Sequence, residues 1–297
     1  MKKIFFFTFL TAAFLAACSS DDQDEPKQEP RLITVEVTEN PLLDANGTPK
    51  QLPTRTAAAT TSESLSAFFM NYTDNKYGFE KTGGSWSSNP NDWPWPVSGN
   101  DTKIDFYAYN AGTFNWNSGN PYLSFTMDAS ASSQTDLLVA THKAISFNDA
   151  GGKVSLDFDH ACAAVKFNIS MTAGVGDKSV IVKSVVLSGV KNKGEYYYNS
   201  EGTKWQSLSV SADSPLIDGY TPASYTLTTG AITLTTEKRA LPCGYLFLIP
   251  QSKKGMTLTV KYTVNGDASE YTFNLSGTWE AGTEYIVNIS LGTSIIH

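Results

Sequence analysis

The sequence predicts an all-β protein built from antiparallel β-sandwiches, and three observations support this fold class. Apolar and polar residues alternate through several runs, no long stretch has the period of an amphipathic helix, and Asn-Gly, Gly-Gly and Pro separate many of the runs. Successive side chains of a strand point to opposite faces, so each alternating run can bury one face and expose the other. Strands at this spacing, with no helices between them, are typical of antiparallel sandwiches.

The alternation is clearest in four runs, residues 154–158, 165–171, 258–264 and 285–291. Residues 245–249 are apolar throughout, which is typical of a strand covered on both faces. Further strands are expected at residues 32–38, 66–72, 103–109, 122–127, 137–140, 180–187, 224–228 and 231–235.

The chain has 297 residues, which is long enough for two domains. A turn-rich stretch, Asn148-Asp149-Ala150-Gly151-Gly152, separates the strands into two groups. We therefore expect an N-terminal β-sandwich domain over residues 32–150 and a C-terminal β-sandwich domain over residues 151–297.

The N-terminus has the pattern of an export signal. Lys2 and Lys3 precede an apolar run, residues 4–15, which is too short to span a bilayer with margin. The run ends in Leu15-Ala16-Ala17-Cys18, which resembles the lipobox of bacterial lipoproteins. We therefore expect residues 1–17 to be a cleaved lipoprotein signal peptide and Cys18 to carry the lipid.

The residues after Cys18 are polar, acidic and proline-bearing, so residues 18–31 are expected to form a disordered tether. An acidic run at this place also resembles the signal that directs some lipoproteins to the outer face of the outer membrane. The chain has a net charge of −7 and no basic cluster, which argues against nucleic acid and against electrostatic binding to anionic lipid. Attachment to the outer membrane would therefore come from the lipid on Cys18.

The sequence contains few of the motifs that mark catalytic or metal-binding sites. The three histidines have no metal-ligand spacing, and the chain has no nucleophile elbow or phosphate-binding loop. Asp159 and His160 are neighbours on a strand and point to opposite faces, so we interpret His160 as a structural residue. The sequence therefore predicts no enzyme activity, no catalytic residue, no metal site and no cofactor.

Two groups of residues each allow two interpretations. Cys162 and Cys243 lie in apolar strand-like runs and form either a disulfide or two buried thiols. Trp86, Trp93 and Trp95 lie in a long Trp- and Pro-rich insertion, residues 83–100, and form either an aromatic patch that stacks on sugars or a buried anchor for that insertion. We favour the anchor, because a long ordered loop needs an apolar attachment.

Several features occur together in a characteristic order. They are the lipobox, the acidic tether, a first strand that ends before Pro53-Thr54-Arg55-Thr56, the stretch Ile104-Asp105-Phe106-Tyr107-Ala108-Tyr109, the stretch Asp136-Leu137-Leu138-Val139-Ala140, and Phe158-x-His160-Ala161 within an alternating run. This order resembles the fimbrillin-like family of Bacteroides-type pilus lipoproteins, the subunits of type V pili. The resemblance spans the mature chain.

The resemblance implies two tandem transthyretin-like sandwiches and assembly by β-strand exchange. An arginine-specific protease would cut after Arg55, remove the strand at residues 32–38 and open a groove for a strand of the next subunit. Arg31 precedes that strand, so a cut there would open no groove. The donor would be the segment near residues 285–297, but few residues follow the last clear strand, which leaves shaft, tip and anchor roles open.

The function expected from the resemblance is a structural or accessory subunit of an adhesive cell-surface fimbria. Its partners would be other pilus subunits and the outer membrane, with the adhesion ligand unknown. The alternative is a surface lipoprotein that binds glycans through the tryptophan-rich insertion.

Overall fold

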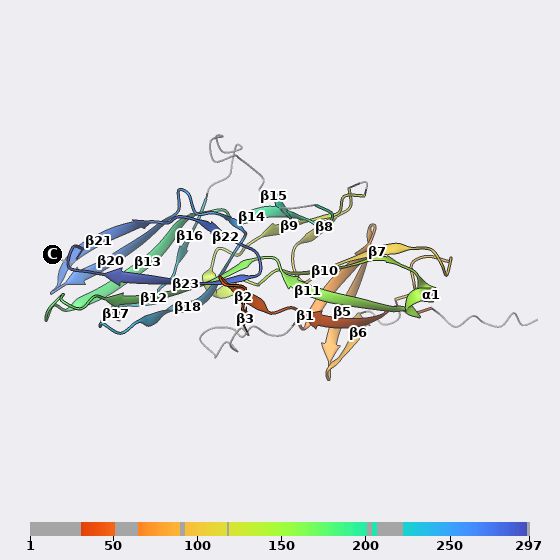
Figure 1. The fold of residues 1–297 in the computed structure, drawn as a ribbon, viewed down its shortest axis with the longest axis horizontal. Helices are drawn as coiled ribbons and strands as arrows, with labels where there is room; N and C mark the ends of the chain where they lie inside the picture. Colours follow the sequence, from red (N-terminus) through yellow and green to blue (C-terminus); the bar gives the residue numbers. More distant parts are fainter. Residues whose placement is uncertain are drawn as a thin grey trace, which may run out of the picture. The chain divides into compact units, whose positions relative to one another are not determined.

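The structure is a computed structural model, and it describes residues 31–50, 65–89, 93–117, 119–200, 204–206 and 222–295. Within these ranges the chain is almost entirely β-structure, as the alternation predicts (Figure 1). The two helices are short: α1 spans Phe147–Ala150 and the 3-10 helix η1 spans Ala131–Ser133. Neither of them, nor any other part of the described chain, provides an apolar helix long enough to cross a membrane.

The largest sheet has seven strands. In spatial order they are β1 (Thr34–Glu39), β11 (Lys153–His160), β10 (Leu138–Ile145), β7 (Ile104–Tyr109), β4 (Ala67–Tyr72), β5 (Asn75–Thr82) and β6 (Ser85–Asn89). Their inward side chains, with those of Ile33 and Trp95 outside the strands, form the N-terminal core, a cluster that includes Phe68, Met70, Phe79, Phe106, Val154, Leu156 and Phe158. In β11 the alternation places three apolar side chains in this core and the polar ones on the outer face.

Two further sheets enclose the C-terminal core. The first has the order β18 (Arg239–Leu248), β12 (Ala163–Met171), β23 (Thr283–Leu291), β2 (Leu42–Asp44) and β3 (Pro49–Lys50). The second has the order β16 (Ala223–Thr226), β13 (Val180–Val190), β20 (Thr257–Val264) and β21 (Asp267–Asn274), with β17 (Ile232–Thr233) paired to β13. The C-terminal core includes Val165, Phe167, Val182, Val185, Leu187, Leu246, Leu258, Val260, Tyr262, Trp279, Ile289 and Leu291.

The remaining strands form two small sheets. One has the order β15 (Trp205–Gln206), β14 (Lys193–Tyr197), β9 (Tyr122–Thr126) and β8 (Thr113–Asn115), and the other pairs β19 (Gln251–Ser252) with β22 (Thr278–Trp279). A third cluster, the aromatic core, includes Leu42, Tyr107, Tyr109, Phe125, Cys162, Ala164, Tyr196, Tyr198, Trp205, Tyr245 and Phe247. This core therefore joins residues that are far apart in the sequence.

Most of the expected strands are confirmed, including the strand covered on both faces. In β18, Leu246 and Leu248 enter the C-terminal core while Tyr245 and Phe247 enter the aromatic core. Three pairings are parallel, namely β1 with β11, β2 with β23, and β12 with β23, while the other ladders are antiparallel. The insertion expected as a loop over residues 83–100 begins with a strand, β6.

The proposed division at residue 150 stays a prediction. β11 begins after that residue but pairs with β10 and β1, which come before it. In the same way β9 pairs with β14 across the boundary. Two groups of strands are present, but hydrogen-bonded ladders connect residues on both sides of the boundary.

Candidate assembly site around the first strand

β1 is an edge strand with one neighbour. Among the described residues its ladder is with β11, to which it runs parallel (Figure 1), from Thr34 opposite Lys153 to Glu39 opposite Phe158, while Leu32 just before it forms a single bridge with Pro94. An edge strand can leave without breaking any other ladder of its sheet, and its departure exposes the backbone N–H and C=O groups of its neighbour. β1 therefore has the topology required of a removable strand.

The inward side of β1 is apolar. Ile33 is buried in the N-terminal core, and Val35 and Val37 pack against the same core while remaining half-buried. The period of two places these three side chains on one face. Removing β1 would therefore uncover a row of apolar contact positions along β11.

The start of the β1–β11 ladder depends on a glycine. The backbone N–H of Thr34 donates to the carbonyl oxygen of Gly152 over 2.8 Å, and that of Ile33 donates to Trp93 over 2.8 Å. Gly152 has φ of +84°, and a Cβ at this position would lie 2.6 Å from the carbonyl oxygen of Leu32. Only glycine combines this backbone conformation with such a close approach of the incoming strand.

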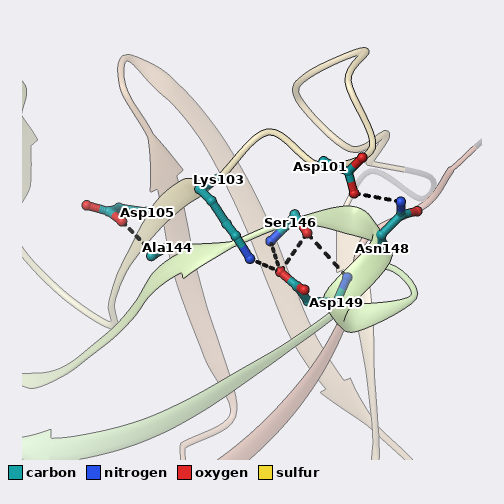
Figure 2. Close-up of polar contacts among 7 residues, drawn as sticks. All are labelled: Asp101, Lys103, Asp105, Ala144, Ser146, Asn148 and Asp149. Carbon is teal, nitrogen blue, oxygen red and sulfur yellow. Dashed lines mark hydrogen bonds and ion pairs between the residues drawn. The ribbon is translucent and has the colours of Figure 1, made fainter.

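A polar network holds the turn that ends in Gly152. Figure 2 shows the carboxylate of Asp149 between Lys103 and Ser146. Ser146 caps the N-terminus of α1 in a capping box with Asp149, and Gly151 ends the helix in the left-handed conformation. The hydrogen bond from Lys103, aided by Ser146, lowers the pKa of Asp149 to about 2. This network fixes the path of the chain from β10 into β11.

Two further contacts in Figure 2 secure the same region. Asp105 accepts a hydrogen bond from the backbone N–H of Ala144 over 2.8 Å, where the β10 ladder is irregular and Ala144 has φ of 52°. The Asn148 side chain donates to Asp101 over 2.8 Å. The end of the groove that receives the start of β1 is therefore built by residues outside β1.

The outer side of β1 is polar and matches the outer side of β11. Glu36 forms an ion pair with Lys153, and the Thr38 hydroxyl donates to Asp157. Both contacts are exposed, so solvent screening leaves each a small contribution to stability. In the ladder Thr38 lies directly opposite Asp157, whereas Glu36 lies opposite Ser155 and reaches diagonally to Lys153.

The chain leaves β1 at Asn40 and crosses to the next sheet. The Asn40 side chain donates to Asp159 over 2.8 Å, and the Glu39 carboxylate accepts from the backbone N–H of Leu65 over 2.8 Å. Leu65 begins the part of the chain that follows residues 51–64. The segment before those residues is thus attached to the segment after them through Glu39.

β2 and β3 continue this cover onto the second sheet. Leu42 is only 1% exposed and lies in the aromatic core, whereas its neighbour Leu43 is 40% exposed. The backbone N–H of Leu43 donates to Gly282 over 2.8 Å, beside the parallel pairing of β2 with the start of β23. Asp44 then accepts hydrogen bonds from the turn that leads into β3. Residues 32–50 therefore cover β11 and the first residues of β23.

A buried acid–base pair lies beneath the crossover. The Nδ1 atom of His160 is 2.5 Å from a carboxylate oxygen of Asp136, and both side chains are nearly buried. Burial by itself lowers the pKa of His160, but the hydrogen bond and charge of Asp136, with the charge of Glu39 and a hydrogen bond to the Asn40 backbone, raise it above its ordinary value. Sequence reasoning correctly separated His160 from Asp159 but missed Asp136.

The predicted lipidation site Cys18 and the predicted cleavage site Arg55 lie outside the described residues. The same holds for the signal peptide, residues 1–17. Both assignments stay predictions. The strand expected before Arg55 lies within the described ranges as β1, whereas β2 and β3, also before Arg55, were not expected.

The three tryptophans of the predicted aromatic patch contact the N-terminal core. Trp95 is 5% exposed, while Trp86 and Trp93 are half-buried. Each ring packs edge-on against a different partner, namely Phe68 for Trp86, Tyr77 for Trp93, and both Phe106 and Phe147 for Trp95. The Trp93 indole also donates to the carbonyl oxygen of Gly78 over 3.2 Å. This geometry favours the anchor over a flat sugar-stacking surface.

The two cysteines lie in different surroundings. Cys162 is a free, fully buried thiol in the aromatic core, and burial raises its pKa well above the ordinary value. Cys243 is half-buried and packs against the C-terminal core. The structure has no bridge between them, and of the two thiols only Cys162 is fully buried. Within the described ranges, no group of three or more His, Cys, Asp or Glu side chains could hold a metal ion.

No curated protein matches this chain. Several solved structures do match it. A fimbrial protein from Bacteroides vulgatus is 16% identical and aligns over 90% of this chain and 96% of its own, with a TM-score of 0.54. A proposed cell adhesion protein from Bacteroides ovatus is 14% identical over 89% of this chain and 93% of its own, with a TM-score of 0.51. A proposed cell adhesion protein from Parabacteroides distasonis is 11% identical over 89% of this chain and 90% of its own, with a TM-score of 0.52.

At such low identity these likenesses show the fold alone. The family model described as fimbrillin-like matches residues 52–297 and so covers most of the chain. The expected family is therefore confirmed, and this chain belongs to the fimbrillin-like family.

Proposed function

We propose that this protein is a structural or accessory subunit of a cell-surface fimbria that assembles by β-strand exchange. The observation that carries the proposal is the edge position of β1, whose ladder within the described residues is with β11. Membership of the fimbrillin-like family supports the pilus role, the cell-surface location and a structural rather than an enzymatic task. The fimbrial relative from Bacteroides vulgatus shares the fold.

In this proposal the precursor reaches the outer membrane as a lipoprotein acylated on Cys18. A protease then cuts after Arg55, in the segment between β3 and Leu65. Cleavage there separates β1, β2 and β3 from the rest of the chain in one step, together with the lipid. A cut after Arg31 would leave all three strands attached.

Loss of β1 to β3 would create an acceptor groove. The edge of β11 would lose its ladder partner, and the apolar positions covered by Ile33 and Leu42 would be exposed to water. Filling each of these positions again with an apolar side chain is worth about 1.5–3 kcal/mol. A strand of another subunit that restores the ladder and these contacts would therefore form a stable joint.

β23 is not suited to leave its own sheet as a donor strand. It pairs with β12 over eight residues on one side and with β2 on the other, and Ile289 and Leu291 lie in the C-terminal core. Withdrawing β23 would open that core. The described part of the chain thus supports the role of acceptor.

The proposal is tested by treating the purified mature protein with an arginine-specific protease. We expect a new N-terminus at Thr56, release of residues 18–55 and uptake of an added apolar strand peptide at the vacated edge of β11. Arg55→Ala should abolish all three results, whereas the matched variant Arg31→Ala should leave them unchanged. The proposal fails if protein cut at Arg55 neither polymerises nor takes up a strand peptide.

A further inference from the structure

The edge of β11 carries a distinct charge pattern on its outer face. The outward residues are, in chain order, Lys153, Ser155, Asp157 and Asp159, and they alternate with the fully buried Val154, Leu156 and Phe158. One end of this edge is therefore positive and the other end carries two negative charges.

Residues 32–50, the resident segment, provide a polar partner for each charged side chain of this pattern. Lys153 pairs with Glu36, Asp157 accepts from the Thr38 hydroxyl, and Asp159 accepts from the Asn40 amide over 2.8 Å. The order along the resident strand is thus an acid, then a hydroxyl donor, then an amide donor. This match is separate from the apolar contacts, which lie on the opposite face of β1.

From this match we propose that the β11 edge selects its incoming strand by charge order. The strand, from another subunit, would lie parallel to β11, with an acidic side chain near Lys153 and hydrogen-bond donors or basic side chains facing Asp157 and Asp159. This inference rests on the proposed strand exchange. It adds a rule for which strand is accepted and in which direction.

The same pattern sets the orientation of the strand. A strand inserted in reverse would bring its acid toward Asp157 and Asp159 and its donors toward Lys153. Like charges placed opposite each other are unfavourable, moderately so at exposed positions such as these, and they act on specificity more than on total affinity. The pattern therefore disfavours the antiparallel arrangement, so a strand whose apolar residues fit in both directions binds more tightly in the parallel one.

The apolar contacts fix the spacing within the accepted strand. Ile33, Val35 and Val37 contact the N-terminal core at every second residue, and Leu42 reaches the aromatic core five residues further along the chain. An incoming strand therefore needs apolar residues at these spacings. The charge order then distinguishes among the strands that meet this condition.

The test uses the full mature chain with the recognition sequence of a site-specific protease inserted between Arg55 and Thr56. After cleavage, displacement of the resident fragment is followed by mass spectrometry in the presence of a synthetic competitor. The reference competitor is a peptide with the sequence of residues 32–44. The pattern-reversed competitor carries Glu36→Lys, Thr38→Glu and Asn40→Asp, which leave its net charge unchanged.

We expect the reference peptide to displace the fragment and to bind about tenfold more tightly than the pattern-reversed peptide. In a protein that carries Lys153→Glu, Asp157→Lys and Asp159→Lys, the preference should invert. These side chains are on the outer face, so the core is unaffected, and the comparison of the two peptides on the unaltered protein needs no protein variant.

Equal binding of the two peptides would overturn charge selection while leaving strand exchange intact. Failure of both peptides to displace or replace the fragment would overturn strand exchange itself, and charge selection with it. A preference that does not invert in the reversed protein would also overturn the inference, because the discrimination would then come from the peptides alone.

Discussion

His160 and Asp136 form a nearly buried pair at the end of β11, where the chain crosses from β1 to β2. The groups that face His160 are Asp136, the Glu39 charge and the Asn40 backbone. Two of these belong to the segment that cleavage after Arg55 would remove. His160 lies in the part of the protein that this cleavage would retain, and two of its partners lie in the segment that contains β1. The protonation state of His160 therefore affects how strongly that segment is bound.

The first prediction concerns pH. The pKa of His160 is raised in the folded protein, so its stabilising contribution is complete below the unfolded value of about 6.5 and is lost as pH rises through the folded value. We expect the free energy of unfolding of the intact chain to fall as pH rises from about 6.5 through the raised pKa of His160. Urea unfolding at a series of pH values measures this change.

His160→Gln should flatten that pH dependence, because it removes the titrating group. His142→Gln is the matched control, since that ring is at the exposed face of β10 and contacts the Ser155 carbonyl oxygen. A slope that persists in His160→Gln would show that another group is responsible.

A second prediction concerns the turn at the start of the ladder. Gly152→Ala places a Cβ 2.6 Å from the carbonyl oxygen of Leu32, so the start of β1 must move. We expect a loss of about 1–3 kcal/mol in the free energy of unfolding and easier release of the β1 segment. Gly151→Ala also has a positive φ but nothing within 4 Å of the added Cβ, so it should lose only about 1 kcal/mol. Equal losses in the two variants would contradict the crowding of Gly152.

A third prediction compares two adjacent leucines in β2. Leu42→Ala removes a side chain from the aromatic core and should lower the free energy of unfolding of the intact chain by about 2–5 kcal/mol. Leu43→Ala alters a side chain that is 40% exposed and should lower it by about 1 kcal/mol or less. Chemical denaturation of both variants measures the difference.

A fourth prediction concerns the thiols. Because Cys162 is fully buried and its pKa is raised, it should resist alkylation in the folded protein and react only after unfolding. A chain with Cys18→Ala and Cys243→Ala isolates this residue for mass spectrometry with and without urea. In the chain that keeps both Cys162 and Cys243, reduction should leave the intact mass unchanged. A gain of two hydrogens on reduction would reveal the bridge that the structure lacks.

Sequence periodicity predicted the strands that bury one face. β11, β12, β20 and β23 were all recognised because apolar side chains recur at every second position. β21 was missed because nearly all of its side chains are exposed, so its sequence has no buried face to reveal it. β2 and β3 were missed because they are too short to show a period.

The pairing of the strands was less accessible to sequence reasoning than their positions. β1 and β11 are over a hundred residues apart, and local patterns carry no information on which distant strand is the neighbour or in which direction it runs. The same limit applies to the candidate site. The strand proposed for removal could be named from its place before Arg55, but Asp136 could not be paired with His160, because Asp136 lies in the loop before β10 and His160 lies at the end of β11.

The parallel register of β1 and β11 has a mechanical consequence. A pull along the strand axis, as in a pilus under tension, would act on all the hydrogen bonds of this ladder in shear, so they must fail together rather than one after another. A pull across the axis would instead open the ladder from one end, bond by bond. A strand seated in this register would therefore resist lengthwise force far better than it resists peeling, and the same joint could be strong in a fibre and still be exchangeable during assembly.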